Sequence, residues 1–227
     1  MIVSILDYSH VISLGVNCTP CHQLTRVATL HQFPESRFSG PFDWCGVRIG
    51  DLTRTVASRF ANYFNPESCT IFGMTEHSFK VRDSLGCEAW HILRRTNESE
   101  IPSKASWRGM KKWVDRRVAN WNRIISDPSG KILFVRFQDV QTVETEELFL
   151  PLIDSLSEQV AGQFTIAAIA IENELSMNHP RIKPFSVPAT WPLDMHADDV
   201  DWDKDYGLGG VAWKSHDLSW DKIWAVV

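Results

Sequence analysis

Apolar residues follow two periodicities between residues 11 and 171, one typical of strands and one typical of helices. Short apolar runs predict strands at residues 11–14, 70–72, 78–81, 89–93, 132–135 and 164–171. Apolar positions three or four residues apart predict helices at residues 19–30, 49–64, 106–125 and 145–160. Ser106 is the expected cap of the third helix, and Pro151 predicts a late start of the fourth. This mixture of elements predicts an α/β (α+β) fold.

The pattern changes near residue 178. Four prolines interrupt regular structure there (Pro180, Pro184, Pro188 and Pro192), and an acidic stretch follows at residues 194–205. Five tryptophans in the same region argue against disorder, because disordered segments are poor in aromatic residues. We predict a single domain over residues 1–227, with a core at 11–171 and a Trp-rich, loop-rich tail at 178–227 packed on that core.

Composition and charge limit the partners and the cellular compartment that we expect for the protein. A net charge of −5 argues against a nucleic-acid partner, because phosphate binding requires a basic surplus. The longest apolar run, Phe164 to Ile171, is far shorter than the roughly 20 residues of a membrane span. Residues 1–10 contain Asp7 and no Lys or Arg, so they lack the charged start of a secretory signal. Five cysteines, an odd number, do not suggest a disulfide framework. We therefore expect a cytoplasmic protein.

Cys18 stands where catalytic cysteines are often found. It falls between a strand closed by Gly15 and a helix that Asn17 can cap and that carries Pro20 in its first turn. Unpaired N–H groups and the helix dipole favour a thiolate at such a position, and the same N–H groups can stabilise an oxyanion. A nucleophilic thiolate also needs an imidazole. His91, in a predicted strand after a turn, is the favoured partner, and His77, in a connection, is the alternative.

Two motifs resemble a known family. The run from Val11 to Cys18 contains S-L-G-V-N-C, and Gly40-Pro41-Phe42-Asp43-Trp44 follows after one helix. This pair resembles the putative papain-like cysteine peptidases, which are found mostly in bacteria. Residues 83–86, leading to His91, are similar to a D-x-x-x-G stretch before the family's histidine. The Arg-rich helix with Arg116 and Arg117 and the strand ending at Arg136 also fit, so that the resemblance covers roughly residues 11–171.

The resemblance implies a papain-like fold and a thiol chemistry. The fold would have the helix that carries Cys18 packed on a mostly antiparallel sheet containing the strands around His91, Val135 and Ile169. The activity would be that of a cysteine peptidase or a related thiol hydrolase or acyltransferase, acting on a peptide or other acyl or amide substrate without a cofactor. A papain-like site also needs a third polar residue to orient the imidazole. Asp139 is one candidate and Asp43 is the other, although Asp43 can equally well cap a structural turn.

Other classes of protein remain possible from the sequence. Cys18-Thr19-Pro20-Cys21 is a C-x-x-C opening a helix, which is also the arrangement of thioredoxin-like dithiol oxidoreductases. Cys18 and Cys21 with Cys87 and His91 would make a Cys3His zinc set, although the spacing of the second pair is loose. The basic helix face of Lys111, Lys112, Arg116 and Arg117 is typical of a solvated surface. A catalytically inactive binding domain is the third alternative.

Overall fold

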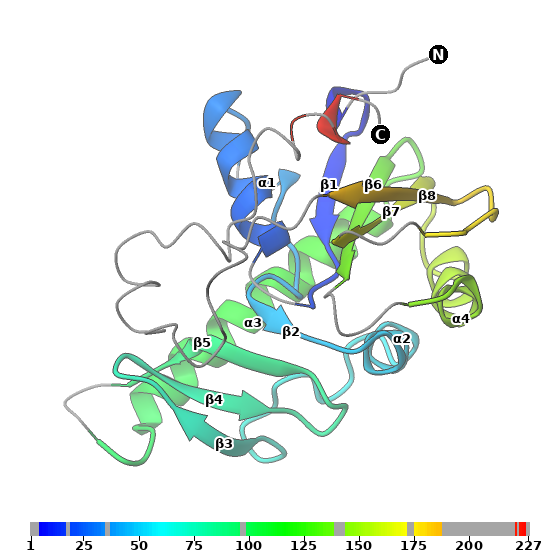
Figure 1. Cartoon of the computed structure of the whole chain (residues 1–227). Coiled ribbons are helices and arrows are strands. Elements are labelled where there is room, and N and C mark those ends of the chain that lie inside the picture. Colours follow the sequence, from blue (N-terminus) through cyan, green and yellow to red (C-terminus); the bar gives the residue numbers. More distant parts are fainter. Residues whose placement is uncertain are drawn as a thin grey trace, which may run out of the picture.

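A computed structural model of the chain describes residues 5–16, 19–34, 37–95, 99–138, 144–171, 175–187, 221 and 223–225. Within these residues the chain forms four α-helices and two four-stranded sheets, one parallel and one antiparallel (Figure 1). The predicted α/β (α+β) class is confirmed.

The parallel sheet forms the centre of the larger layered part. Its strands are β1 (His10–Ser13), β6 (Lys131–Gln138), β7 (Gln163–Ile171) and β8 (Ile182–Val187), which pair in that order. All three pairings are parallel. Residues 132–135 of β6 and 166–170 of β7 are apolar at successive positions, as expected for strands covered on both faces.

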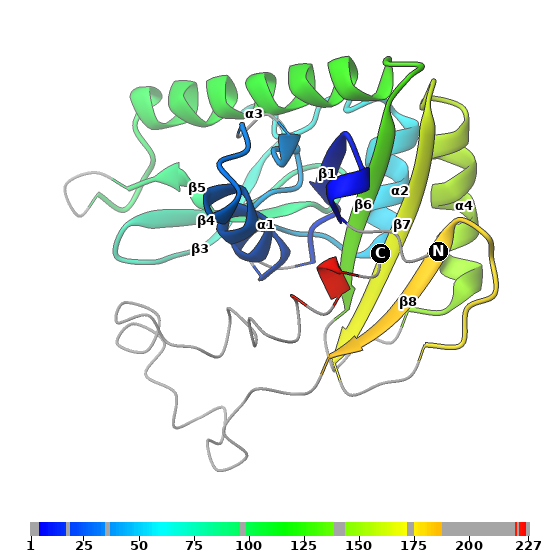
Figure 2. The ribbon, with the colours of Figure 1, turned by 90° about the horizontal axis from the view of Figure 1, so that it is seen from above.

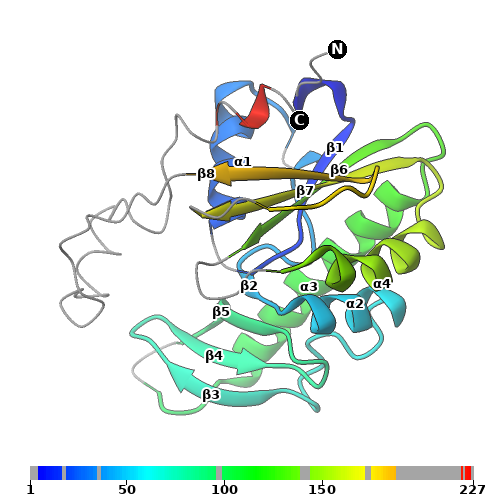
Figure 3. The same ribbon diagram turned by 45° about the vertical axis from the view of Figure 1, so that its right-hand side comes forward.

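Helices cover both faces of this sheet (Figure 3). α1 (Thr19–Leu30) lies on one face, where Leu24 and Val27 share an apolar cluster with alternate residues of β6 and β7. α2 (Ile49–Ala57), α3 (Lys104–Ile125) and α4 (Glu146–Ser157) lie on the other face. The side chains of Ile12, Phe134 and Ile166 point into that second cluster. The result is a three-layer arrangement.

The antiparallel sheet lies beside this arrangement, below α3 in the view of Figure 2. Its strands are β2 (Cys45–Gly46), β5 (Glu88–Arg94), β4 (Ser78–Arg82) and β3 (Thr70–Met74), in that spatial order. Between the pairs Val81–Ala89 and Phe79–Leu93, β5 has three intervening residues where β4 has one. His91 is the middle residue of this bulge.

The expected single, mostly antiparallel sheet is wrong. Val135 and Ile169 lie in the parallel sheet, whereas His91 lies in the antiparallel one, and α1 packs on β1 and β6. The reason is connectivity. β6 and β7 are joined through α4, and a crossover through a helix returns the chain in the same direction. β3, β4 and β5 are joined by short turns and therefore alternate in direction.

Helix boundaries differ from the sequence pattern in three places. α2 ends at Ala57 instead of residue 64, since Arg59 and Phe60 adopt positive φ, although Phe60 and Phe64 are buried as their spacing suggests. α3 is capped by Ser103, whose Oγ accepts a hydrogen bond from the Ser106 N–H (3.0 Å), and not by Ser106. α4 begins at Glu146 and tolerates Pro151 in its interior, so the predicted late start is also wrong.

β8 was not expected, because Pro184 stands in its middle. Within the described residues the strand pairs on one side, with β7, and an edge strand tolerates a proline that cannot donate to a ladder. Farther along the predicted tail, Ile223 and Trp224 are buried in the cluster that contains α1 residues. Most of residues 178–227 lie outside the described part, and the division into core and tail stays a prediction. None of the described helices is both long and apolar enough to span a membrane.

Candidate functional site

The turn after β1 has an unusual backbone. Gly15 and Val16 both have positive φ, +77° and +94°. A β-branched residue such as Val16 rarely adopts this conformation, which costs of order 1–3 kcal/mol. The Ser13 hydroxyl accepts a hydrogen bond from the Gly15 N–H (3.1 Å) and holds the turn. Strain of this kind often marks functional turns at the carboxyl edge of a parallel sheet.

A buried arginine on the neighbouring strand β6 also stabilises this turn. Arg136, on β6, is 1% exposed and donates a hydrogen bond from Nη1 to the Leu14 carbonyl oxygen (2.9 Å). Its Nε donates to Glu144 Oε2 (2.9 Å), and its Nη2 pairs with Glu144 Oε1. Gln138 accepts a hydrogen bond from the Glu144 backbone N–H (2.9 Å), which fixes the partner in turn. The sequence pointed to Arg136 only as part of the family resemblance.

Cys18 and Asp139 lie outside the described residues. These are the two candidate residues that the sequence predicts nearest to this turn and sheet edge. Their neighbours are described: β1 ends at Ser13, α1 begins at Thr19, and β6 ends at Gln138. Pro20 stands in the first turn of α1 as predicted. β1 and β6 are adjacent parallel strands, so their carboxyl ends meet at one edge of the sheet.

The second family motif packs directly against the first. A Cβ on Gly15 would lie 2.5 Å from Val47 Cγ1 and 3.1 Å from the Cys45 carbonyl oxygen. A Cβ on Gly40 would lie 2.5 Å from Ile12 Cγ2. The two segments can approach this closely only because both positions are glycine. The structure therefore brings together two motifs that the sequence separates by a helix.

Asp43 is the charged centre of the second motif and is 1% exposed. Its Oδ2 accepts a hydrogen bond from the Gly40 N–H (3.0 Å), which is the turn cap considered from the sequence. The same oxygen lies 2.8 Å from Arg117 Nη1 of α3. The Arg117 guanidinium also stacks over the Trp113 ring (5.1 Å to the centroid). Arg117 is thus buried in an ion pair, and its assignment to a solvated basic face is wrong.

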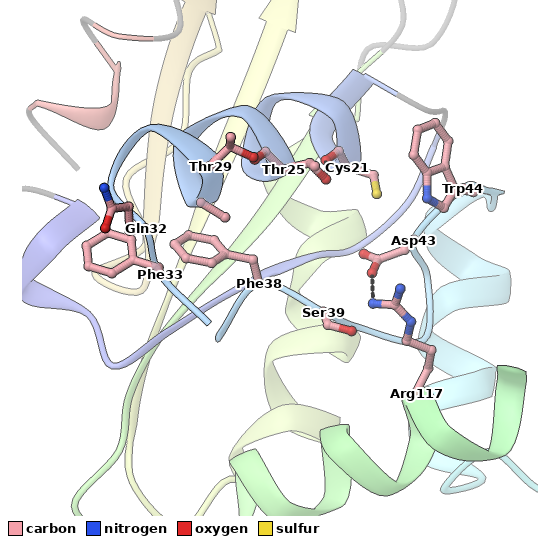
Figure 4. A pocket seen from close by; sticks show the side chains of 11 residues that line it. Cys21, Thr25, Thr29, Gln32, Phe33, Phe38, Ser39, Asp43, Trp44 and Arg117 are labelled. Carbon is pink, nitrogen blue, oxygen red and sulfur yellow. Dashed lines mark hydrogen bonds and ion pairs between the residues drawn. The ribbon is translucent and has the colours of Figure 1, made fainter. Parts of the chain in front are cut away.

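A cavity of about 450 Å³ lies between α1 and this motif (Figure 4). One wall consists of one face of α1, formed by Cys21, Thr25, Ala28 and Thr29, and of Gln32 in the turn that follows the helix. The facing wall comes from the following segment and from α3, and consists of Phe33, Phe38, Ser39, Asp43, Trp44 and Arg117. In Figure 4 the Cys21 sulfur points toward the end of the cavity where Asp43 and Trp44 lie. We call this space the α1 cavity.

His91 adjoins this end of the α1 cavity through Trp44. The two rings meet edge to face, with centroids 6.4 Å apart. Trp44 itself has a positive φ of +62°, a second strained residue beside the site. Partial desolvation, and to a smaller extent the nearby Lys80 cation, lower the pKa of His91 below 6.5. A lowered pKa favours the neutral form of the ring, which is the form that can accept a proton.

His77 has a different environment. Its side chain is 83% exposed in the turn before β4, and its Nε2 lies 3.6 Å from Glu76 Oε2. It does not line the α1 cavity.

Of the cysteines that the structure describes in the antiparallel part, Cys45 and Cys87 are buried in the core and Cys69 is partly buried against it. Burial raises the pKa of Cys87 well above its usual value, and its Sγ lies 3.3 Å from the Thr55 hydroxyl. Burial also raises the pKa of Cys69 to about 12. Among the described residues, no group of three His, Cys, Asp or Glu side chains is arranged to hold a metal ion. The zinc set that includes Cys18 extends beyond these residues.

Two features of the candidate site escaped the sequence analysis: the Asp43–Arg117 pair, and the position of Trp44 between the α1 cavity and His91. Asp43 and Arg117 are 74 residues apart in the chain, and no local pattern connects them. The one available signal was that an Asp flanked by aromatic residues must be buried, and a buried carboxylate needs a partner.

The fold and the site define an α/β protein with a strained strand–turn–helix element at the carboxyl edge of a parallel sheet. The chain belongs to the family described as putative papain-like cysteine peptidase, whose model matches residues 9–174. This match confirms the family that the two sequence motifs indicated. No curated protein matches the chain, and no solved structure matches it.

Proposed function

We propose that the protein is a thiol-dependent hydrolase or acyltransferase in which Cys18 is the nucleophile. The observation that carries this proposal is the strained turn at Gly15 and Val16, held by buried Arg136 immediately before α1. The positive φ of Val16 is costly for a β-branched residue, and such a cost is often tolerated where a reactive side chain must be presented. Membership of the peptidase family supports the same role for the only cysteine in the S-L-G-V-N-C motif.

His91 is the proposed general base and acid. Its support is the position beside Trp44 at one end of the α1 cavity, together with a pKa below 6.5. A neutral imidazole can take the thiol proton at pH 7 and later return it to a leaving group. His77 remains the alternative, but its exposed position in a turn gives it less support.

Asp139 is the proposed third residue, which would orient the imidazole. Gln138, the residue before it, ends β6 at the sheet edge that also carries the turn toward Cys18. Asp43 is the alternative. Its carboxylate already binds the Gly40 N–H and Arg117, which favours a role in holding the cavity wall.

The proposed chemistry proceeds in two steps. The Cys18 thiolate attacks the carbonyl carbon of an amide or ester, and backbone N–H groups at the start of α1 stabilise the oxyanion. His91 protonates the departing amine or alcohol, which leaves a thioester on Cys18. Water, activated by His91, hydrolyses this thioester in a hydrolase, whereas an acceptor amine or alcohol attacks it in an acyltransferase.

Labelling with chloroacetamide at pH 7, followed by mass-spectrometric mapping, tests the nucleophile. We expect rapid modification of Cys18, its loss in Cys18→Ala, and slow modification of Cys69 and Cys87, whose raised pKa keeps them as thiols. Preferential labelling of another cysteine would refute the assignment. His91→Ala should slow the reaction at Cys18, while His77→Ala should not.

A dithiol oxidoreductase is the second candidate, since Cys21 lies in the first turn of α1 and lines the α1 cavity. It predicts a Cys18–Cys21 disulfide that forms and breaks reversibly in thioredoxin-range redox buffers. Cys21→Ala separates the two candidates, because it would abolish dithiol chemistry but preserve rapid labelling of Cys18.

A further inference from the structure

The solvent-facing side of α3 is strongly basic. The helix contains seven Lys or Arg residues and one acidic residue, Asp115, so its net charge is +6. The whole chain has a net charge of −5, which means that the residues outside α3 carry −11. Asp115 is paired with Lys111, and Arg117 is buried in its pair with Asp43. The other five cations of the helix are exposed: Lys104, Arg108, Lys112, Arg116 and Arg123.

These five exposed cations, which we call the α3 basic face, lie on one side of the helix. At about 100° per residue they fall within an arc of about 120° and extend over about 28 Å of helix. The buried residues Met110, Val114 and Trp121 lie on the opposite side. Figure 2 shows α3 along one edge of the molecule. The α3 basic face therefore points away from the rest of the protein.

An exposed apolar side chain precedes this face in the chain. Ile101, three residues before the start of α3, is 74% exposed, more than any other large apolar side chain in the part of the chain that the structure describes. Its turn is held by hydrogen bonds. The Ser99 hydroxyl donates to the Ile101 carbonyl oxygen (2.7 Å), and Arg95 Nε donates to the Ser99 carbonyl oxygen (2.8 Å). The turn thus presents an apolar group to solvent at one end of the basic face.

The shape of the α3 basic face favours one kind of polyanion. Proteins that bind single-stranded nucleic acids combine a basic groove with exposed aromatic side chains. The α3 basic face is the outside of a single helix, and the aromatic rings of Trp107 and Trp113 are partly buried against the core. A bilayer with anionic lipids is flat and negatively charged, so it can meet an outer helix along its whole length. It also offers an apolar layer in which Ile101 can be buried.

We infer that the α3 basic face docks the protein on a membrane surface that contains anionic lipids, with Ile101 inserted among the headgroups. Each Lys or Arg close to such a surface strengthens binding about fivefold. The net charge of the other residues disfavours any orientation in which they face the membrane. Docking through α3 leaves the α1 cavity open, because Arg117, which lines that cavity, lies on the buried side of the helix. The inference does not depend on the proposed role of Cys18.

Co-sedimentation of the full chain with lipid vesicles tests this inference. We expect binding to phosphatidylcholine vesicles that contain about 30% phosphatidylserine, and binding at least about tenfold weaker to pure phosphatidylcholine. Raising the salt from about 0.1 M to about 1 M should release the protein, because the Debye length falls to about 3 Å. Ile101→Ser should weaken binding at least about threefold, since it removes the apolar group that enters the headgroup layer.

Charge variants identify the surface that binds. Lys112→Gln/Arg116→Gln removes two cations of the α3 basic face and should weaken binding to the phosphatidylserine vesicles about 30-fold. Arg48→Gln/Arg59→Gln is the matched control, because it removes the same charge from exposed positions outside α3. This control should bind within about twofold of the wild-type chain. Circular dichroism verifies that each variant is folded.

Three results would overturn the inference. Equal binding to vesicles with and without phosphatidylserine would show that the charge of α3 does not attract the protein to membranes. Equal loss of binding in the two double variants would show that net charge matters and the α3 basic face does not. Tighter binding to single-stranded oligo(dT) than to the vesicles, lost in Lys112→Gln/Arg116→Gln, would assign the face to nucleic acid instead.

Discussion

Arg136 donates a hydrogen bond to the carbonyl oxygen of Leu14 and, through the rest of its guanidinium, holds the buried carboxylate of Glu144. One cation thereby joins the strained turn after β1 to the segment before α4. Burying two charges is unfavourable unless their hydrogen bonds are nearly complete. The desolvation cost of the Arg136–Glu144 pair indicates that apolar packing alone does not hold the backbone of the turn in place.

Arg136→Met should strongly destabilise the protein, because it leaves the Glu144 carboxylate buried without its cation. We expect a loss of about 3–5 kcal/mol in the free energy of unfolding, measured by urea denaturation. The double variant Arg136→Met/Glu144→Met removes both charges and should lose less than the sum of the single variants. A single-variant loss below about 1 kcal/mol would contradict the buried pair, since exposed pairs give effects of that size.

The ion pair between Asp43 and Arg117 should show strong energetic coupling. A double-mutant cycle with Asp43→Asn and Arg117→Met is expected to give about 1–3 kcal/mol, because both side chains are buried and in direct contact. The exposed pair Lys111–Asp115 on the same helix is the matched control. Its cycle should give no more than about 0.5 kcal/mol. Equal coupling in the two cycles would mean that burial does not strengthen the Asp43 pair.

The pKa of His91 should lie below 6.5 in the folded protein, owing first to desolvation and then to Lys80. The folded protein disfavours the protonated ring, so the free energy of unfolding should fall as the pH drops from about 6.5 toward the folded-state pKa. An NMR titration of the His91 Cε1–H signal, assigned with His91→Gln, measures the value. Lys80→Met should raise it, whereas Lys111→Met removes the same charge from α3 and should not. A pKa above 6.5 would remove the support for His91 as a base at neutral pH.

Much of the fold was predictable because local patterns decide individual elements. The apolar runs at β1, β4, β6 and β7 and the stripe of α3 correspond to the observed elements within a few residues. The arrangement of strands into sheets was predicted less well. β7 is apolar at successive positions and does not alternate, a pattern typical of a parallel strand covered on both faces. The resemblance to the papain-like family nevertheless predicted a mostly antiparallel sheet. β8 was hidden by Pro184, which only an edge position permits.

The candidate site was predictable in its motifs but not in its contacts. The motifs around Cys18 and Asp43 identified the family, and both the Gly15 turn and the Asp43 loop are strained or buried as functional segments often are. The partnership of Asp43 with Arg117 depends on how α3 crosses the loop, which no local pattern encodes. The sequence could not show that Arg117 lies on the buried face of α3, because a charged residue at a helical position is usually solvated.

Gly15, the one glycine of the S-L-G-V-N-C motif, should not tolerate replacement by alanine. An alanine there must adopt a φ of +77°, and its Cβ would meet Val47 at 2.5 Å and the Cys45 carbonyl oxygen at 3.1 Å. Left-handed backbone and overpacking each cost of order 1–3 kcal/mol, so Gly15→Ala should lower the free energy of unfolding by at least about 2 kcal/mol. Gly109 in the interior of α3 is the control, since a Cβ there meets no atom within 4 Å. Gly109→Ala should raise stability by about 0.5–1 kcal/mol, as expected for an open helical position. Urea denaturation of both variants gives the comparison, and if Gly15→Ala were as stable as the wild-type chain, the close approach of the two family motifs would have to be abandoned.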